Sequence, residues 1–199
     1  MSNVGTLPRR LKIGKRWYRI RTDRKDIFKI IEAFLDPNLP EEAQMYICMK
    51  ILYIDYDSIP RRLYNEAAHA AMDFINQEKT EIDASPPKSS PKTMDWIQDE
   101  PLLFSSVNKV AGFETRNAKY IHWWTFLGWL MEIDEGTYKY VLYLRNKKAK
   151  GKKLEKEERE FWNANKDICV IKNRLSDEEQ ARKNKLNAII EKQNKSVVK

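Results

Sequence analysis

The sequence predicts a predominantly all-α fold: a helical bundle around a buried, tryptophan-rich central helix, with a small N-terminal β-hairpin and charged C-terminal helices. The first observation is composition, because 42% hydrophobic residues in a chain of 199 are enough for one core. The second is that only six glycines are present, which disfavours turn-rich β architecture and phosphate-binding loops. The third is that three of the six tryptophans fall within residues 120–133, which marks that segment as core.

The N-terminal segment Leu11–Ile20, LKIGKRWYRI, has the pattern of a β-hairpin. Apolar residues alternate with charged residues on the first strand, and Gly14-Lys15 can form the turn. An isolated hairpin is only marginally stable in water, so we expect it to pack on the rest of the chain. We assign residues 1–22 to a hairpin arm and expect Asp23 to cap the first helix.

Residues 23–146 are predicted to form the helical body. Apolar residues at helical spacing predict three successive helices before residue 79. A fourth helix is expected at Trp96–Val110 and another at residues 137–148. Residues 80–93 are rich in proline and serine and have no apolar period, which indicates a linker within the body.

The segment Tyr120–Ile133, YIHWWTFLGWLMEI, reads as a helix that is apolar nearly all round. Such a helix is either buried or spans a membrane. The apolar run is about a dozen residues, whereas a membrane span needs roughly 20, so we expect no membrane insertion. The segment is therefore interpreted as the central helix, and a ligand pocket lined by the same aromatic rings is the alternative. The predicted structural core residues are Trp123, Trp124, Phe126, Leu127 and Trp129.

The net charge of +8 is distributed unevenly along the chain. Residues 145–199 contain 17 Lys/Arg against 9 Asp/Glu, and residues 9–25 contain 9 basic residues against one acid. Residues 26–144 are acidic, with 11 basic residues against 19 acids. An acidic body with two basic ends is typical of a protein that binds nucleic acid, an acidic partner or further copies of itself. We expect a homo-oligomer and regard nucleic-acid binding, through the hairpin and the C-terminal helices, as a less favoured alternative.

Residues 147–199 are predicted to form a charged helical extension with few apolar anchors. Ser176 and Glu179 have the spacing of a capping box at the start of the last helix. Such helices can become ordered on binding a partner. The candidate partner-binding residues are Phe161, Trp162, Leu186, Ile189 and Ile190 in the extension, with Arg9, Arg10, Arg16 and Trp17 on the hairpin.

No catalytic or metal-binding motif stands out, so we expect no enzyme, no cofactor and no metal. Glycine-rich nucleotide motifs, HExxH and GxSxG are absent from the sequence, and His122 has no nucleophile or acid in a recognisable motif with it. Cys48 and Cys169 are far apart in sequence, which favours reduced thiols. The acids of DWIQDE, including Asp95 and Asp99, are expected to lie at the solvated start of a helix.

Four blocks of the sequence, taken in order, resemble a bacteriophage family known as the gene product fifteen family. They are LPRRLKIGKRWYRIRTDRKDIFKIIEAFLD, MDWIQDEPLLFSSVNKVAGFE, IHWWTFLGWLMEI and YLRNKKAKGKK. The resemblance extends to about residue 172. It implies a tail-region protein of long-tailed phages of Gram-positive hosts, and it brings no catalytic residues.

The same resemblance implies a tail assembly chaperone in the cytoplasm of the bacterial host. Its partners would be the tape-measure protein, the major tail protein that builds the tube, or both. The alternative within this family is a tail-completion or connector component that stays in the virion.

Overall fold

The computed structural model describes residues 4–77 and 92–197, with side chains described as far as residue 189. The predicted linker at residues 80–93 lies outside this part of the chain, except for Lys92 and Thr93. The described residues are mainly helical and include a two-stranded antiparallel sheet, which confirms the predicted fold class. In chain order the elements are β1 (Arg10–Ile13), β2 (Arg16–Arg19), α1 (Arg24–Leu35), α2 (Glu41–Leu52), η1 (Tyr56–Ser58), η2 (Arg61–Leu63), α3 (Tyr64–Asn76), α4 (Glu100–Ala111), η3 (Thr115–Asn117), α5 (Trp123–Met131), α6 (Thr137–Ala149), α7 (Lys156–Ala164), α8 (Lys166–Cys169) and α9 (Asp177–Val197).

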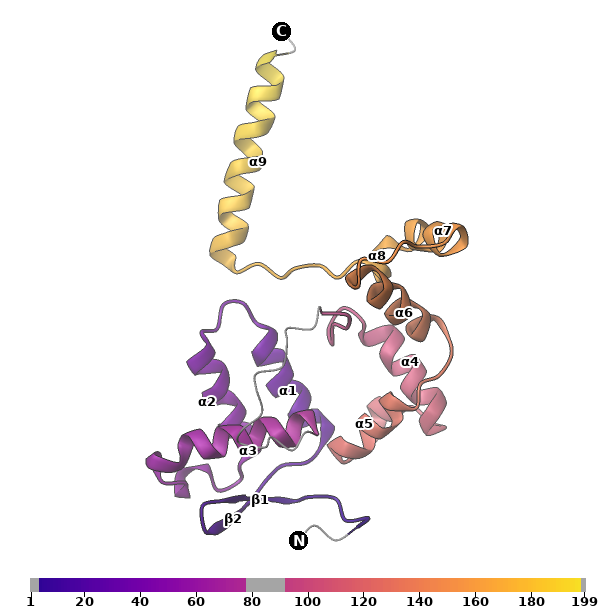
Figure 1. The fold of residues 1–199 in the computed structure, drawn as a ribbon. Coiled ribbons are helices and arrows are strands. Elements are labelled where there is room, and N and C mark those ends of the chain that lie inside the picture. Colours follow the sequence, from indigo (N-terminus) through magenta and orange to yellow (C-terminus); the bar gives the residue numbers. More distant parts are fainter. Residues whose placement is uncertain (1–3, 78–91, 198–199) are drawn as a thin grey trace.

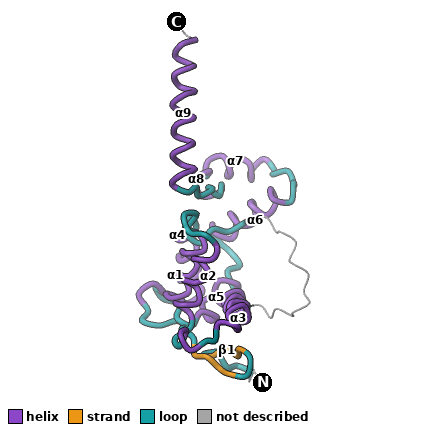
Figure 2. Tube along the Cα trace, turned by 90° about the vertical axis from the view of Figure 1, so that its left-hand side faces the viewer, coloured by secondary structure: helices purple, strands orange, loops and turns teal. Residues whose placement is uncertain are grey.

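Two groups of helices lie side by side (Figure 1). In the first group α1 packs on α2, and α3 packs on β1 of the hairpin. In the second group α4 contacts both α5 and α6. Because α5 also contacts α1, it joins the two groups. α9 extends away from the body in both views (Figure 1 and Figure 2).

The hairpin forms where the sequence predicts it, with Arg10 opposite Arg19 and a turn at Gly14, whose φ of 56° favours glycine. Alternate residues face α3, so that Ile13 and Tyr18 are buried. This packing supplies the support that an isolated hairpin lacks. The chain then leads to Asp23, which caps α1 as predicted.

α4 begins at Glu100 and not at Trp96, as the sequence indicated. The preceding residues form a turn because the Asp95 carboxylate accepts the backbone N–H groups of Ile97 and Gln98. The carboxylate of Asp99 in turn accepts the backbone N–H of Asp95. Short acidic side chains that bond to nearby backbone N–H groups compete with helix formation, which explains the later start.

α5 is short, and its residues from Trp123 to Leu130 are buried or half-buried, in keeping with a sequence that is apolar nearly all round. Trp123, Phe126 and Leu127 are buried, Trp124 and Trp129 are half-buried, and Met131 is 69% exposed. The two adjacent indoles have a specific role, because Trp123 Nε1 donates to the carbonyl of Ile75 and Trp124 Nε1 to that of Phe74. These carbonyls belong to the last turn of α3, which has no helical partners for them.

An aromatic cluster links α1, α4, α5 and the turn before α4. Its centre is Phe28 of α1, whose ring centroid lies between 5.2 and 5.8 Å from four other ring centroids. Tilted and edge-on pairs of this kind add stability beyond the area that they bury. The members are Phe28, Trp96, Phe104, Trp123 and Phe126.

Replacing Trp123 by Phe should test the role of its indole in ending α3. The variant leaves the buried carbonyl of Ile75 without its donor, so the free energy of unfolding should fall by about 1–3 kcal/mol. Trp129→Phe is the matched control, because its half-buried ring packs edge-on against Phe113 and should keep that contact. Equal urea midpoints for the two variants would contradict this account.

Candidate functional site

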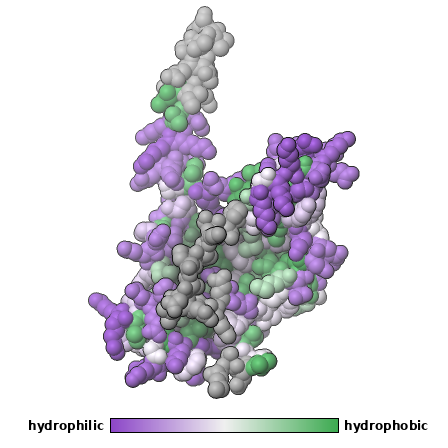
Figure 3. All heavy atoms as spheres, viewed as in Figure 1, coloured by the Kyte–Doolittle hydropathy of each residue, from purple (hydrophilic) through white to green (hydrophobic). Residues whose placement is uncertain are grey.

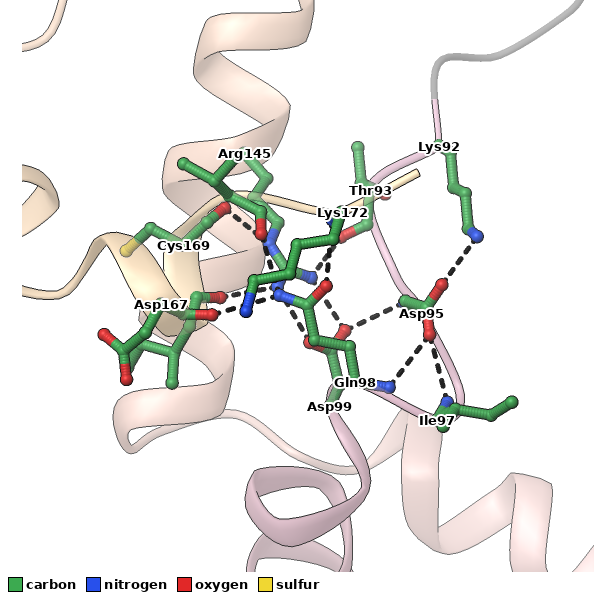
Figure 4. A network of polar contacts seen from close by, with 12 residues as sticks. Lys92, Thr93, Asp95, Ile97, Gln98, Asp99, Arg145, Asp167, Cys169 and Lys172 are labelled. Atoms are coloured by element: carbon green, nitrogen blue, oxygen red, sulfur yellow. Dashed lines mark hydrogen bonds and ion pairs between the residues drawn. The ribbon is translucent and has the colours of Figure 1, made fainter. Parts of the chain in front are cut away.

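The C-terminal part of the body is organised around Arg145 of α6, whose side chain is only 3% exposed. Its Nη1 and Nη2 donate to the two carboxylate oxygens of Asp99 at 2.7 and 2.8 Å. Nη1 also donates to the carbonyl of Thr93, Nη2 to that of Ile168, and Nε to that of Cys169 (Figure 4). All five N–H groups of the guanidinium therefore have acceptors, which a buried charge requires.

Asp95, four residues before Asp99, is fully buried. It binds the segment that leads to α9, through Arg174. Its carboxylate accepts from both Nη atoms of Arg174 and from Lys92 Nζ. Burial raises the pKa of Asp95, but hydrogen bonds from Arg174, from the Gln98 N–H and from Lys92 outweigh it and hold that pKa well below its usual value. The expectation that Asp95 and Asp99 are solvated is therefore wrong, because arginines distant in sequence pair with them.

Gln98 completes this network. Its Nε2 donates to the carbonyls of Val170 and Asp167, and its Oε1 accepts the backbone N–H of Lys172 (Figure 4).

The helix α6 continues to Ala149, two residues beyond the position where the sequence analysis starts the C-terminal extension, residue 147. We call the five side chains that fasten residues 167–174 to the start of α4 the C-terminal clasp: Asp95, Gln98, Asp99, Arg145 and Arg174.

Two of the candidate partner-binding residues dock on the body. The ring of Phe161 on α7 meets the ring of Tyr140 on α6 edge-on, with 4.9 Å between centroids. The Lys148 ammonium lies 4.2 Å from the centroid of the Trp162 ring. Both aromatic side chains are half-buried, so they hold α7 against α6 in this structure.

The candidate residues on α9 are exposed instead. Leu186 is 57% and Ile189 53% exposed, and Ile190 follows in the same helix with its side chain outside the described part. In Figure 3 a small hydrophobic patch, in green, interrupts the hydrophilic surface of the projecting helix just below its grey end. The base of the helix is fixed by the predicted capping box of Ser176 and Glu179, which the structure contains.

The candidate residues on the hairpin lie at the opposite end of the molecule from α9 (Figure 1). Arg9, Arg10 and Arg16 are exposed, and Trp17 is 60% exposed. The guanidinium of Arg9 lies 5.8 Å from the centroid of the Tyr120 ring. The structure therefore does not bring the two predicted groups of partner-binding residues together.

An apolar groove that the sequence did not reveal runs between α1 and the start of α4. It has a volume of about 380 Å³. Three members of the aromatic cluster line it, together with Ile97, which is 48% exposed, and two acids. The only local signal in the sequence is the pair Trp96-Ile97 among the acids of DWIQDE. The lining residues are Phe28, Ile31, Glu32, Trp96, Ile97, Glu100 and Phe104.

His122 has a structural role between the hairpin arm and α5. Its Nδ1 accepts the backbone N–H of Trp124 and so caps α5, while Nε2 lies 2.9 Å from the carbonyl oxygen of Pro8. Nε2 must carry the proton in this arrangement, because a carbonyl oxygen only accepts. Burial lowers the pKa of His122, the bond to Pro8 opposes this, and the nearby charge of Arg9 lowers it further.

Neither a metal centre nor a membrane span is found in the described part of the chain. Residues 4–77 and 92–197 hold no group of three or more His, Cys, Asp or Glu side chains arranged to bind a metal ion. None of the helices in these ranges combines the length and apolar character needed to cross a membrane. Fold and surface thus define a helical protein whose distinctive features are an apolar groove and a projecting helix.

The comparison with protein families gives a match over most of the chain. The family model described as "Bacteriophage Gp15 protein" matches residues 5–171. The chain therefore belongs to the bacteriophage Gp15 protein family, which confirms the resemblance seen in the sequence. No curated protein and no solved structure matches the chain. The matched residues include the hairpin and the whole apolar groove, whereas α9 begins after the match ends.

The lowered pKa of His122 should make stability depend on pH. The unfolded state binds a proton near pH 6.5, and the folded state only at lower pH, so the free energy of unfolding should fall as pH drops below about 6.5. His122→Asn keeps a capping acceptor but cannot titrate. Urea unfolding between pH 8 and pH 5 should therefore give a shallower loss of stability for this variant. Parallel pH profiles would show that His122 does not contribute.

Breaking the buried Asp99–Arg145 pair should cost more stability than breaking an exposed ion pair. Asp99→Asn leaves the buried Arg145 guanidinium without its counter-charge, which should cost about 3–5 kcal/mol in urea unfolding. Glu135→Gln removes the charge from the exposed pair with Lys109 and should leave the urea midpoint nearly unchanged. A small effect of Asp99→Asn, comparable to the control, would rule out a central role for the clasp.

Proposed function

We propose that this Gp15-family protein is a phage tail assembly chaperone that binds the tape-measure protein, the major tail protein, or both. It acts in the cytoplasm of the bacterial host, without catalysis. Family membership supports a phage tail-region role. The finer assignment rests on the surface of the molecule, which offers places for helical partners.

The observation that carries the proposal is α9. This 21-residue helix extends away from the body (Figure 1) and exposes Leu186 and Ile189. A helix without tertiary packing gains little stability in water, so an apolar stripe on a projecting helix favours a partner that covers it. A long helical chain such as a tape-measure protein offers a matching stripe, and two helices can pair through such stripes.

The small size of the stripe favours reversible binding, which a chaperone needs because tube subunits must later replace it. Two described apolar anchors bury little area, and most other residues of α9 are charged or polar. Ordering of the helix on binding would further reduce the net affinity. These properties suit a protein that covers its partner during assembly and then leaves.

Co-expression in bacteria with the tape-measure protein of the same phage tests this function. The full chain should raise the soluble fraction of the tape-measure protein, and the double variant Leu186→Ser/Ile189→Ser should lose this effect. Asn184→Ser/Asn187→Ser is the matched control, because it places the same residue at the same spacing on exposed polar positions of α9. It should behave as the unaltered chain does.

A tape-measure protein that is equally soluble with and without this chain would contradict the chaperone function. Mass spectrometry of purified virions separates the alternative within the family. A chaperone should be missing from finished particles, whereas a tail-completion or connector component should be present in a fixed number of copies.

A further inference from the structure

We propose that the apolar groove between α1 and α4 binds α9 of a second copy of this chain. The inference does not depend on the proposed function, because it concerns the purified protein alone. The groove has the apolar lining of a helix-binding site: the aromatic rings of Phe28, Trp96 and Phe104 and the exposed side chain of Ile97. Grooves of this kind hold apolar anchors spaced at i, i+3 and i+4 on an amphipathic helix.

α9 carries such anchors. Leu186 and Ile189 are three residues apart, so they lie on one face of the helix, and both are exposed. Ile190 provides the i+4 position in the sequence. The anchors of the ligand and the apolar lining of the groove are therefore matched in chemistry.

Charge complementarity supports α9 as the occupant, and its helical anchors distinguish it from the basic hairpin, whose strands present no such spacing. Basic residues precede the anchors within about one turn, at Arg182, Lys183 and Lys185. The acids that line the groove are Glu32 on α1, which is exposed, and Glu100 at the start of α4, which pairs with Arg116, so Glu32 is the acid offered to the basic residues of α9. Opposite charges around an apolar contact fix the register of binding and exclude other partners.

The occupant comes from a second copy because α9 of the same chain is directed elsewhere. Its base is fixed near the end of α1, where the Asp177 N–H donates to Asn38 Oδ1, and Arg174 is held by Asp95. From there α9 extends away from α1 and α4 in both views (Figure 1 and Figure 2). Leu186 lies nine residues beyond Asp177, about 14 Å further along the helix axis.

The groove and α9 are different surfaces, so the contact between two copies is heterologous. Each copy carries one groove and one α9. Association of this kind can be broken by altering either surface, and it can be restored by mixing the two altered proteins. Because the charged contacts are exposed, added salt should weaken association. The same helix face is used for a tape-measure partner in the proposed function, so the two ligands of α9 should compete.

The test is light scattering after gel filtration, over a range of protein concentrations at low salt. The unaltered chain should show a mass that rises above the 23.7 kDa of the monomer. Ile97→Arg, which places a like charge opposite the basic residues of α9, and Leu186→Ser/Ile189→Ser should each reduce the mass to that of the monomer. Val110→Arg, at an exposed position of α4 that is not part of the groove, and Asn184→Ser/Asn187→Ser should associate as the unaltered chain does.

The decisive arm is a mixture of the two monomeric variants. Ile97→Arg retains an intact α9 and Leu186→Ser/Ile189→Ser retains an intact groove, so an equimolar mixture should form a heterodimer of twice the monomer mass. A monomeric mixture would overturn the pairing, as would an unaltered chain that is monomeric at every concentration. Association that survives both variants would also overturn it. None of these results depends on tape-measure binding.

Discussion

The arrangement of the C-terminal half depends on the burial of one guanidinium, that of Arg145. Removing a charge from water is costly, and the cost is offset only when each donor finds an acceptor in good geometry. The acceptors come from three separate places: the carboxylate of Asp99, the carbonyl of Thr93 and the end of α8. Satisfying Arg145 therefore fixes the start of α4, α6 and the chain that leads to α9 relative to one another.

A second buried arginine performs the same task where the two groups of helices meet. Arg24 is 1% exposed, and its guanidinium donates to Asp23 and to the carbonyls of Thr115, Arg116 and Ala118. Burial lowers the pKa of Arg24, and the charge of Asp23 opposes this. The Arg24 guanidinium thus takes the place of water as donor to these loop carbonyls and binds the loop to α1. The ring of Phe28, one turn further along α1, contacts Trp123 and Phe126 of α5.

Much of the fold follows from local patterns, whereas the groove and the clasp do not. Helical spacing predicts the helices before residue 79, Gly14 predicts the hairpin turn, and the caps at Asp23 and Ser176 follow from residue type. Arg145 stands in a run of charges and looks solvated in the sequence, because its partners are 23–52 residues away. The hydrogen bonds of the Trp123 and Trp124 indoles likewise depend on where α3 ends, which no pattern within α5 reveals.

These contacts hold together the body from which α9 projects, and the proposed role of this helix is to bind a partner. Hydrogen exchange followed by mass spectrometry tests it most directly, at a dilution where the protein is monomeric. Amides of α9 should exchange rapidly in the free chain and become protected when the tape-measure protein is added, while those of α1 and α6 stay protected throughout. Protection of α9 in the free monomer, or unchanged exchange in the complex, would contradict the claim.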